Sequence, residues 1–321
     1  MTDQILKVRV AHKRDEADGI CSLELLPLSG VVLPDFTPGA HIDVHLAPGL
    51  VRQYSLCNPP SDSQRYVIAV LRDPASRGGS EAVHARVKEG DVLEISAPKN
   101  HFPLAPDAKQ HLLLAGGIGV TPLMSMAEQL SADGAHFVLH YFARSASKAA
   151  FVQRFADASF ASCVQTHWDD ALQEPPVSLK TLIGSPQVGQ HLYVCGPKGF
   201  MDAVLSTARA QSWPEDQLHF EFFGAQVAHD ASDAAFTVKI ASSGQEIQVG
   251  ADQTVIEVLH QAGVDVPIAC EQGVCGTCLV RVLSGIPDHK DMYLTPEEQA
   301  ANDQFTPCCS RSKSPVLVLD L

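Results

Sequence analysis

The stretch Cys270-Glu-Gln-Gly-Val-Cys275-Gly-Thr-Cys278 places three cysteines within nine residues, in the spacing C-x4-C-x2-C. A further pair, Cys308-Cys309, follows after a gap. This spacing is typical of a 2Fe–2S cluster, in which one tight loop supplies three thiolates and a distant segment supplies the fourth. The glycines between the ligands have no Cβ, so they can adopt positive φ and bring backbone N–H groups close to the sulfurs. The sequence therefore predicts a cluster-binding loop near the C-terminus.

Three other interpretations of these cysteines are weaker. A structural zinc site usually shows paired C-x2-C spacings, which the C-x4-C step does not match. A disulfide framework is typical of secreted proteins, and nothing else in the chain indicates secretion. Isolated buried cysteines are common, but they do not explain three in nine residues.

The fourth ligand is one of two adjacent cysteines, of which only one can usually face a cluster. The segment Phe-Thr-Pro-Cys308-Cys309-Ser-Arg311 resembles the ferredoxin pattern in which the ligand lies three residues before an arginine. This resemblance implies that Cys308 is the ligand. Cys309 is then either a small packed residue or an oxidisable thiol.

Length and charge limit the range of functions. The chain has 321 residues, of which 45% are hydrophobic, so two or three domains with full cores are expected. A formal net charge of -14 argues against nucleic acid as a main partner, because phosphate binding needs basic patches. An acidic surface first of all keeps a protein soluble, and it is also compatible with docking to a partner that has a basic patch.

The sequence shows no sign of a membrane or export segment. The first ten residues have no apolar run of the kind found in signal peptides, and they have the pattern of a strand. The longest uncharged run, 112–127, contains several glycines and a proline and is too short to span a bilayer. We therefore expect a soluble, cytoplasmic protein whose thiols stay reduced.

Residues 1–104 alternate apolar and polar residues in short runs that are separated by Gly and Pro. This pattern predicts a small antiparallel β-barrel of six strands, with a short helix near 80–87. The predicted strands cover residues 5–12, 20–27, 41–46, 52–57, 66–71 and 91–97.

Two motifs in this barrel indicate a flavin. In Arg52-Gln53-Tyr54-Ser55, the two-residue period of a strand places Arg52 and Tyr54 on one face. The cation suits a phosphate or the electron-rich edge of the ring, Tyr54 can pack on the isoalloxazine or ribityl chain, and Ser55 can bond a ring atom. Arg77-Gly78-Gly79-Ser80 precedes the predicted helix, where backbone N–H groups can bind phosphate. Each motif alone is weak, because wet strand faces often pair Arg with Tyr and G-G-S is a common turn.

Between residues 105 and 226, strands and helices are expected to alternate, which predicts a parallel α/β sheet with ligands at the carboxyl ends of its strands. The first strand leads into Gly116-Gly-Ile-Gly-Val-Thr121-Pro122, where Thr121 is expected to cap a helix and Pro122 to occupy its first turn. This loop is not the G-x-G-x-x-G fingerprint, so a Rossmann dehydrogenase is disfavoured. The predicted strands cover residues 111–115, 137–142, 161–166 and 191–195.

Residues 225–235 are small, polar and acidic, as expected of a linker. Beyond it, strands are predicted at 236–240, 246–249 and 316–319, with Thr254 capping a helix that runs through Ala262. Together with the cysteine loop, this order resembles the β-grasp plan of plant-type ferredoxins. The stretch 288–291, with Glu297 and Glu298, is expected to be a solvated face, and a docking role is secondary.

The whole chain resembles the phthalate dioxygenase reductase family, within the ferredoxin-NADP reductase superfamily. The resemblance rests on the flavin strand, the sequence Gly-Gly-x-Gly-x-Thr-Pro, the sequence Cys195-Gly196-Pro197 and the cysteine set. It implies an antiparallel β-barrel flavin domain at 1–104, an α/β parallel-sheet nicotinamide domain at 105–226 and a β-grasp ferredoxin domain at 236–321. A linker is expected at 227–235.

The resemblance also implies cofactors and partners. They are FMN, with FAD less expected, a 2Fe–2S cluster and NADH, and the implied acceptors are Rieske-type oxygenases that act on aromatic acids or similar substrates. Hydride carries two electrons and the cluster accepts one, so a flavin that accepts two and releases them singly belongs between NADH and the cluster. We expect a monomer.

The residues implied by this resemblance fall into four groups. Cys195, near the nicotinamide ring, forms the catalytic set with Thr121 and Ser55. Arg144 is expected to bind adenine or a 2′-phosphate, with Lys148 leaving NADPH open as an alternative, and Phe223 is either a flavin-packing aromatic or a core residue. Flavin contacts are expected from Arg52, Gln53, Tyr54, Ser55, Ala69, Val70, Leu71, Gly78, Gly79, Ser80 and Thr121. Nicotinamide contacts are expected from Gly116, Gly117, Ile118, Gly119, Val120, Pro122, Gly196 and Pro197, and cluster ligands are Cys270, Cys275, Cys278 and Cys308.

Two alternatives from other classes are kept open. One is a stand-alone NAD(P)H-dependent flavin and iron–sulfur reductase with a small-molecule or other protein acceptor. The other is a non-catalytic scaffold that binds zinc at the cysteines and a nucleotide elsewhere. A colourless preparation without iron or flavin would favour the scaffold.

Overall fold

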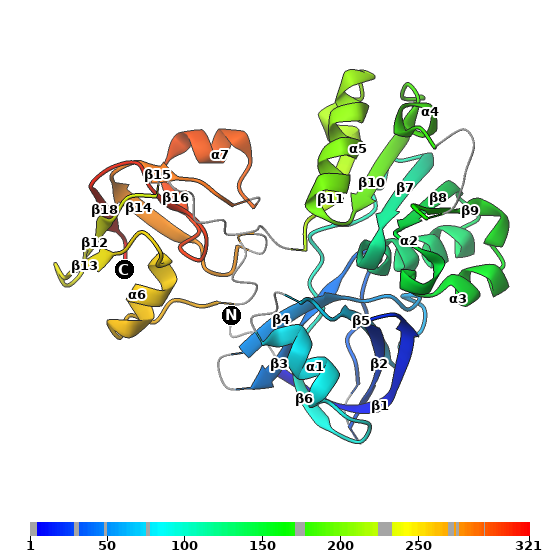
Figure 1. Cartoon of the computed structure of the whole chain (residues 1–321), viewed down its shortest axis with the longest axis horizontal. Coiled ribbons are helices and arrows are strands. Elements are labelled where there is room, and N and C mark those ends of the chain that lie inside the picture. Colours follow the sequence, from blue (N-terminus) through cyan, green and yellow to red (C-terminus); the bar gives the residue numbers. More distant parts are fainter. Residues whose placement is uncertain are drawn as a thin grey trace. The chain divides into compact units, whose positions relative to one another are not determined.

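The computed structural model describes residues 5–28, 32–47, 50–74, 78–170, 177–223, 233–268, 273, 276–291 and 293–321. The chain forms two compact units, Met1–Phe223 and Gly224–Leu321, which are described separately (Figure 1). The predicted fold class is confirmed, because the first unit contains an antiparallel barrel and a parallel α/β sheet and the second contains a small mixed sheet.

The first sheet contains all six strands that the alternating pattern predicted. The elements are β1 (Ile5–Ala17), β2 (Ile20–Pro27), β3 (His41–Ala47), β4 (Leu50–Ser55), β5 (Tyr66–Leu71), α1 (Gly79–Ala85) and β6 (Val92–Ser96). The strand order is β4-β3-β6-β1-β2-β5. The two end strands, β4 and β5, contact each other, and an antiparallel bridge between Leu56 and Ile68 continues this contact. The sheet therefore closes into a barrel that brings the flavin motif on β4 next to β5.

The second sheet is parallel throughout, in the order β11-β10-β7-β8-β9. Its elements, with η for 3-10 helices, are β7 (Gln110–Gly116), η1 (Gly117–Gly119), α2 (Val120–Ala132), β8 (His136–Ala143), η2 (Ala146–Lys148), α3 (Val152–Asp157), η3 (Ala161–Cys163), β9 (Val164–Trp168), α4 (Leu179–Ile183), β10 (Gln190–Cys195), α5 (Lys198–Ala210), η4 (Glu215–Gln217) and β11 (Leu218–Glu221). The strand predicted at 161–166 begins only at Val164, because the Cys163 N–H donates to the Phe160 carbonyl at 2.8 Å and closes a turn. The carboxyl ends of all five strands meet at one edge.

The predicted role of Thr121 as a helix cap is wrong. The 3-10 turn η1 runs directly into α2, so the cap position falls on Gly119 and Thr121 lies inside the first turn. The Thr121 hydroxyl instead donates to the Ile118 carbonyl at 3.0 Å. Pro122 lies in the first turn as predicted, where a backbone N–H is not needed.

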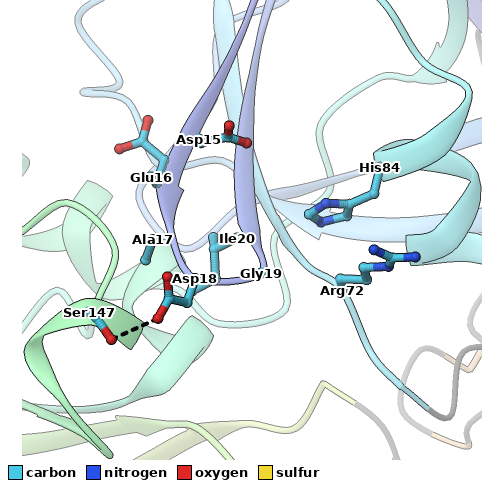
Figure 2. A pocket seen from close by; sticks show the side chains of 9 residues that line it. All are labelled: Asp15, Glu16, Ala17, Asp18, Gly19, Ile20, Arg72, His84 and Ser147. Atoms are coloured by element: carbon cyan, nitrogen blue, oxygen red, sulfur yellow. Dashed lines mark hydrogen bonds between the residues drawn. The ribbon is translucent and has the colours of Figure 1, made fainter.

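Two sets of contacts hold the barrel and the parallel sheet together. Helix α2 packs in the same apolar cluster as barrel residues Ile20, Ala69 and Phe102. At the tip of the β1–β2 hairpin, the Asp18 N–H donates to the Ser147 carbonyl at 2.8 Å, and the Ser147 hydroxyl donates to the Asp18 carboxylate at 2.8 Å (Figure 2). The hairpin thereby fixes the loop that follows β8.

Both tryptophans of the chain belong to the parallel-sheet region. Trp168 ends β9 and meets the ring of Tyr141 edge-on, with 6.0 Å between ring centroids. The Trp213 indole N–H donates to the Gly184 carbonyl at 2.9 Å. Trp168 thus packs on the neighbouring strand β8, and Trp213 is hydrogen-bonded to the residue that follows α4.

The second unit has a mixed sheet in the order β13-β12-β18-β14-β16. Its elements are β12 (Phe236–Ile240), β13 (Glu246–Val249), α6 (Val255–Gln261), β14 (Val280–Ser284), β15 (Pro287–Asp288), α7 (Pro296–Ala301), β16 (Gln304–Phe305), β17 (Arg311–Ser312) and β18 (Val316–Leu319). The central pair β12–β18 is parallel and the other pairs are antiparallel, as the β-grasp plan requires. The predicted cap is confirmed, since the Thr254 hydroxyl accepts from the Glu257 N–H at 3.3 Å in a capping box.

The expectation of a solvated face is wrong for 288–291, whereas Glu297 and Glu298 are exposed as expected. Asp291 is buried and accepts from the Leu294 N–H at 2.9 Å and from the Ser310 hydroxyl at 3.1 Å. The Lys290 ammonium lies 2.6 Å from the Asp233 carboxylate. The partners of Asp291 and Lys290 are Ser310 and Asp233, which lie 19 and 57 residues away in the chain. Local composition therefore does not reveal that these polar residues are covered.

The domain limits 1–104, 105–226, 227–235 and 236–321 stay predictions. Residues 224–232, which make up most of the expected linker, lie outside the described residues. Within the described ranges, no helix combines the length and the apolar character needed to cross a membrane.

Candidate functional site

The first candidate site lies at the carboxyl edge of the parallel sheet, where the glycine loop meets the end of β10. A Cβ on Gly119 would lie 2.3 Å from the Cys195 carbonyl oxygen, and one on Gly196 would lie 2.9 Å from the Gly116 Cα. These separations are shorter than real Cβ contacts, so only glycine fits at Gly119 and Gly196. The structure thus brings together two of the motifs that the sequence predicted to bind nicotinamide.

The same backbone is open at Gly117. Gly117 has φ +53° and nothing within 4 Å of the position that its Cβ would take. The Phe200 ring lies against both Gly116 and Gly196, and it contacts Phe142 with 5.2 Å between centroids. Side chains support the loop from one direction while its open backbone faces another. This cradle fits a nicotinamide, whose ring needs close backbone approach.

A largely buried carboxyl group, which belongs to none of the sequence motifs, lies beside Cys195. Glu221 ends β11 and pairs in register with Cys195 of β10. The Ser55 hydroxyl donates to its carboxyl at 3.4 Å, and the His41 Nδ1 lies 4.0 Å from the other carboxyl oxygen. The barrel strand β4 and the two sheet strands therefore converge on one point, and the predicted residues Ser55 and Cys195 both belong to it.

The electrostatics of this point favour neutral groups. Burial raises the pKa of Glu221 to about 8, and the Ser55 hydrogen bond opposes that rise only in part. Burial, together with the Glu221 carboxyl, raises the pKa of the Cys195 thiol well above its ordinary value. Near pH 7 the site therefore holds a protonated carboxyl, a thiol and a hydroxyl. Such a site can hold a proton at the Glu221 carboxyl without placing a net charge beside a bound ring.

The flavin motifs meet where the barrel closes. A Cβ on Gly79 would lie 2.6 Å from the Arg52 Cγ, so the start of α1 packs directly on the Arg52 side chain. Gly78 has φ +89°, which suits only glycine at this turn. The Tyr54 side chain is partly buried against the barrel core, and burial raises the pKa of its phenol. An arginine, a glycine turn and an aromatic ring thus share one face, as a bound flavin phosphate and ring require.

Three of the expected contact residues, Ala69, Val70 and Val120, have their side chains buried in apolar clusters. Val70 is buried in the barrel core, while Ala69 belongs to the cluster shared with α2 and Leu71 is 41% exposed. Val120 is buried in the shared core. Any contact from Val70 or Val120 to a cofactor must therefore come from the backbone.

Other predicted site residues lie away from the point where Ser55, Cys195 and Glu221 meet. Arg144 is exposed beyond the end of β8, and its carbonyl accepts from the Asp170 N–H at 3.3 Å. Phe223 is 38% exposed at the end of the first unit. The Ser80 hydroxyl accepts from the Asp73 N–H at 3.1 Å, and Arg77 lies outside the described residues. The binding roles of these residues stay predictions.

The second candidate site is the cysteine lobe of the second unit. Cys278, Cys308 and Cys309 are buried in one apolar cluster. Gly273 and Gly276 both have φ +68°, as the cysteine loop was expected to require. The Tyr293 ring packs so closely on Gly276 that a Cβ there would overlap it. Cys270 and Cys275 lie outside the described residues. The buried thiols and the left-handed glycines fit a cluster held by thiolates.

Glu221 and Phe200 were not predicted from the sequence, for a topological reason. Neither belongs to a motif, and each reaches the site through the packing of adjacent elements. The signal was nevertheless present for Glu221, because a polar residue that ends a parallel strand lies at the ligand-binding edge.

Comparisons with known proteins agree with this geometry. Residues 238–313 match the family model of the 2Fe-2S iron-sulfur cluster binding domain, and residues 96–218 match that of the N-terminal domain of dimethylamine monooxygenase subunit DmmA-like proteins. The chain is 53% identical to the vanillate O-demethylase oxidoreductase of Pseudomonas putida, over 97% of this chain and 98% of that protein. A solved phthalate dioxygenase reductase matches with a TM-score of 0.80 and 40% identity, over 99% of this chain and 98% of that one.

The chain belongs to the phthalate dioxygenase reductase family. Another relative in this range of similarity is the tetrachlorobenzoquinone reductase of Sphingobium chlorophenolicum, 41% identical over 95% of this chain and 94% of that protein. Members of the phthalate dioxygenase reductase family are oxidoreductases with a flavin, NAD(H) and a 2Fe–2S cluster, and this chain is one of them. The predictions of family, enzyme class and cofactor types are confirmed.

Proposed function

We propose that the chain is the NADH-dependent reductase component of a Rieske-type oxygenase that removes a methyl group from a methoxylated aromatic acid such as vanillate. The observation that carries this proposal is the 53% identity, over nearly the full length of both chains, to a vanillate O-demethylase oxidoreductase. The site geometry supports it, because a nicotinamide cradle, a flavin face and a cysteine lobe all occur in one polypeptide.

The residues divide between three binding tasks in this proposal. Gly116–Gly119 and Gly196 hold the nicotinamide, Arg52 with Gly78–Ser80 holds the phosphate of FMN, and Cys270, Cys275, Cys278 and Cys308 hold the cluster. When bound, the flavin accepts an electron pair from reduced nicotinamide and releases single electrons to the cluster. The glycines hold the nicotinamide through their backbone, so they fix its position without adding charge.

Ser55, Cys195 and Glu221 lie where β4, β10 and β11 meet. They orient the reactants, and Glu221 holds a proton. The rigid packing of Gly119 on Cys195 fixes the depth at which a ring can lie. Cys195 is fully buried and the Glu221 side chain is only 16% exposed, so little water reaches the point where the ring would react. The Glu221 carboxyl holds its proton near neutral pH, and Ser55 orients that carboxyl through its hydroxyl.

The acidic charge of the chain fits a protein partner. Residues 224–321 contain thirteen Asp and Glu but only five Lys and Arg. We propose that this surface approaches a basic patch of the oxygenase, and that the reductase is a monomer when free. Raising the ionic strength should then lower the rate of coupled turnover, because salt screens such steering.

A reconstituted assay tests the proposal. The purified holoprotein is combined with NADH, oxygen and a vanillate-type Rieske oxygenase, and formation of the demethylated phenol is followed by chromatography. Product formation that requires both proteins supports the proposal. A chain that reduces small acceptors rapidly but sustains no turnover with any Rieske oxygenase would contradict it. Parallel runs with NADPH, and chromatography of the flavin released by heat, decide nucleotide preference and FMN against FAD.

A second candidate function is a stand-alone quinone reductase. The observation that favours it is the 41% identity to a tetrachlorobenzoquinone reductase. Under this alternative, a halogenated quinone would be reduced with a kcat/KM above that for coupled turnover, and salt would have little effect. Comparing the two rates in one preparation separates the candidates.

A further inference from the structure

The two adjacent cysteines at 308 and 309 lie in a tight turn. The Cys309 N–H donates to the Thr306 carbonyl at 3.2 Å, and the Ser310 N–H donates to the same carbonyl at 2.9 Å. In an extended strand, neighbouring side chains point to opposite faces. In a helix-like turn they differ by only about 100° of rotation. Both sulfurs can therefore face the same region, and the two thiols do contact each other.

The Cys309 sulfur lies against Gly273, a described residue of the cysteine loop. A Cβ on Gly273 would lie 2.3 Å from the Cys309 Sγ, so this sulfur occupies the space directly against Gly273. Gly273 stands between Cys270 and Cys275 in the sequence, inside the loop that carries three of the four expected ligands. Cys309 is 1% exposed and Cys308 is 2% exposed, so burial does not separate the two.

The surroundings of Cys309 are polar: two hydroxyl groups can donate to its sulfur, and the Thr306 carbonyl, 3.9 Å away, can accept from its thiol when it is protonated. The Thr306 hydroxyl lies 3.2 Å from the Cys309 Sγ, and the Ser310 hydroxyl lies 3.8 Å from it. Hydroxyl groups at these positions can donate to a sulfur ligand, as outer partners of metal ligands commonly do. A residue that only filled space in an apolar core would not need this polar set.

We propose that Cys309 is a second thiolate placed to complete the cluster site, so that either Cys308 or Cys309 can serve as the fourth ligand. The inference rests on the proposed cluster site. In a chain without Cys308, the Cys309 thiol releases its proton to solvent and its sulfur forms the iron–thiolate bond that Cys308 otherwise supplies. The oxidation states of iron and sulfide do not change in this exchange.

Alanine variants of the whole chain test the proposal. Alanine is preferred to serine, because a serine oxygen can itself ligate iron. Cys308→Ala, Cys309→Ala, the double variant and Cys278→Ala are reconstituted anaerobically with ferrous iron and sulfide. Iron and acid-labile sulfide per chain are measured, together with the visible circular dichroism of the cluster.

The proposal expects both single variants at positions 308 and 309 to hold about two irons and two sulfides per chain. It expects the double variant and Cys278→Ala to hold almost none, because position 278 has no adjacent cysteine. The dichroism of Cys308→Ala should differ from that of the wild type, since its fourth ligand approaches from another residue.

Loss of iron from Cys308→Ala, with full iron in Cys309→Ala, would overturn the proposal. Cys308→Val fills more of the space left by the sulfur than alanine does, so it controls for loss of iron caused by a cavity. Loss of iron from both Cys308→Ala and Cys308→Val overturns the proposal in the same way. The failure of the proposed function would look different, because the wild-type chain would then hold its cluster but sustain no turnover with a Rieske oxygenase, whatever the iron content of the variants.

Discussion

The parallel-sheet region of the first unit and the second unit treat buried ionisable groups differently. In the parallel-sheet region, burial keeps two such groups uncharged near pH 7: the pKa of His140 is lowered to about 4 by burial and by the neighbouring His167, and the pKa of Glu221 is raised to about 8. In the second unit, buried charges are paired: the Asp233 carboxylate lies 2.6 Å from the Lys290 ammonium and 3.6 Å from the Arg311 guanidinium.

The difference follows from what each unit does. In the proposed function the first unit binds a nicotinamide and a flavin, and the uncharged Glu221 and Cys195 would place no fixed negative charge beside the bound ring. The second unit must hold a cysteine segment in place, and Arg311 does so by donating to the carbonyls of Gln253, Ala234 and Gly250. The stability of the first unit should therefore respond to pH, and that of the second to the loss of single charges.

The largest effect is expected from breaking the paired charges with Arg311→Ala. Arg311 is 4% exposed, and its removal leaves the carbonyls of Gln253 and Gly250 without this donor. We expect the second unit to lose about 3–5 kcal/mol of stability, measured as the urea concentration at which iron is released. Arg281→Ala, at an exposed position, is the control. Equal iron release from both variants would contradict the role of Arg311.

Glu221→Gln tests the uncharged carboxyl of the first unit. Because the folded pKa is raised from 4.5 to about 8, the native chain keeps a proton that the unfolded chain releases between these values. The stabilisation is complete below pH 4.5 and is lost as pH rises to about 8, by up to about 5 kcal/mol. The variant cannot titrate, so its unfolding free energy should fall less over this range than that of the wild type. Urea unfolding at pH 5.5 and 8.5 measures this.

The control for this experiment is Glu215→Gln, which changes an exposed carboxyl paired with Arg209. It should keep the pH dependence of the wild type between pH 5.5 and 8.5. If Glu221→Gln behaves in the same way as this control, the Glu221 carboxyl is ionised in the native protein and the contrast between the two units fails.

Gly119→Ala tests whether nucleotide binding by the first unit depends on the close contact between Gly119 and the Cys195 backbone. The added Cβ would lie 2.3 Å from the Cys195 carbonyl oxygen, so the loop must shift, at a cost of about 1–3 kcal/mol. We expect kcat/KM for NADH with ferricyanide to fall roughly 10- to 100-fold, with unchanged flavin content. Gly199→Ala is a matched control, because nothing lies within 4 Å of its added Cβ. A similar kcat/KM in both variants would show that the contact does not position the nucleotide.

The smallest effect is expected from Asp18→Ala at the hairpin tip. This change removes the acceptor of the Ser147 hydroxyl and loosens the loop that follows Arg144, at a cost of about 1 kcal/mol (Figure 2). KM for NADH should rise a few-fold while kcat is kept, because only binding is affected. Asp18→Asn keeps an acceptor and should restore KM, and Asp15→Asn serves as a control on the same hairpin. A fall in kcat with unchanged KM would contradict this role.

Most of the fold could be predicted because its strands follow the two-residue period. The predicted strands at 20–27, 66–71, 236–240 and 246–249 coincide with β2, β5, β12 and β13. The errors arose where local pattern and tertiary context disagree. The strand was predicted from Ala161, but Ala161–Cys163 forms a 3-10 turn, and Thr121 has a capping side chain but follows a 3-10 turn that already supplies the cap position.

The candidate site was predictable where motifs are contiguous. The glycine loop and Cys195 were identified from the sequence, and the structure packs Gly119 on Cys195. Glu221 was missed because its importance depends on the register between β10 and β11. The burial of Asp291 was missed for a similar reason, since Ser310, which donates to it, lies 19 residues further along the chain.

The positions of Trp168 and Trp213 have a practical consequence. Because both indoles belong to the parallel-sheet region, tryptophan emission reports on that region alone, while the colour of the iron centre reports on the other unit. Nucleotide titration and stepwise denaturation can thus be followed at two wavelengths in one cuvette, without any label.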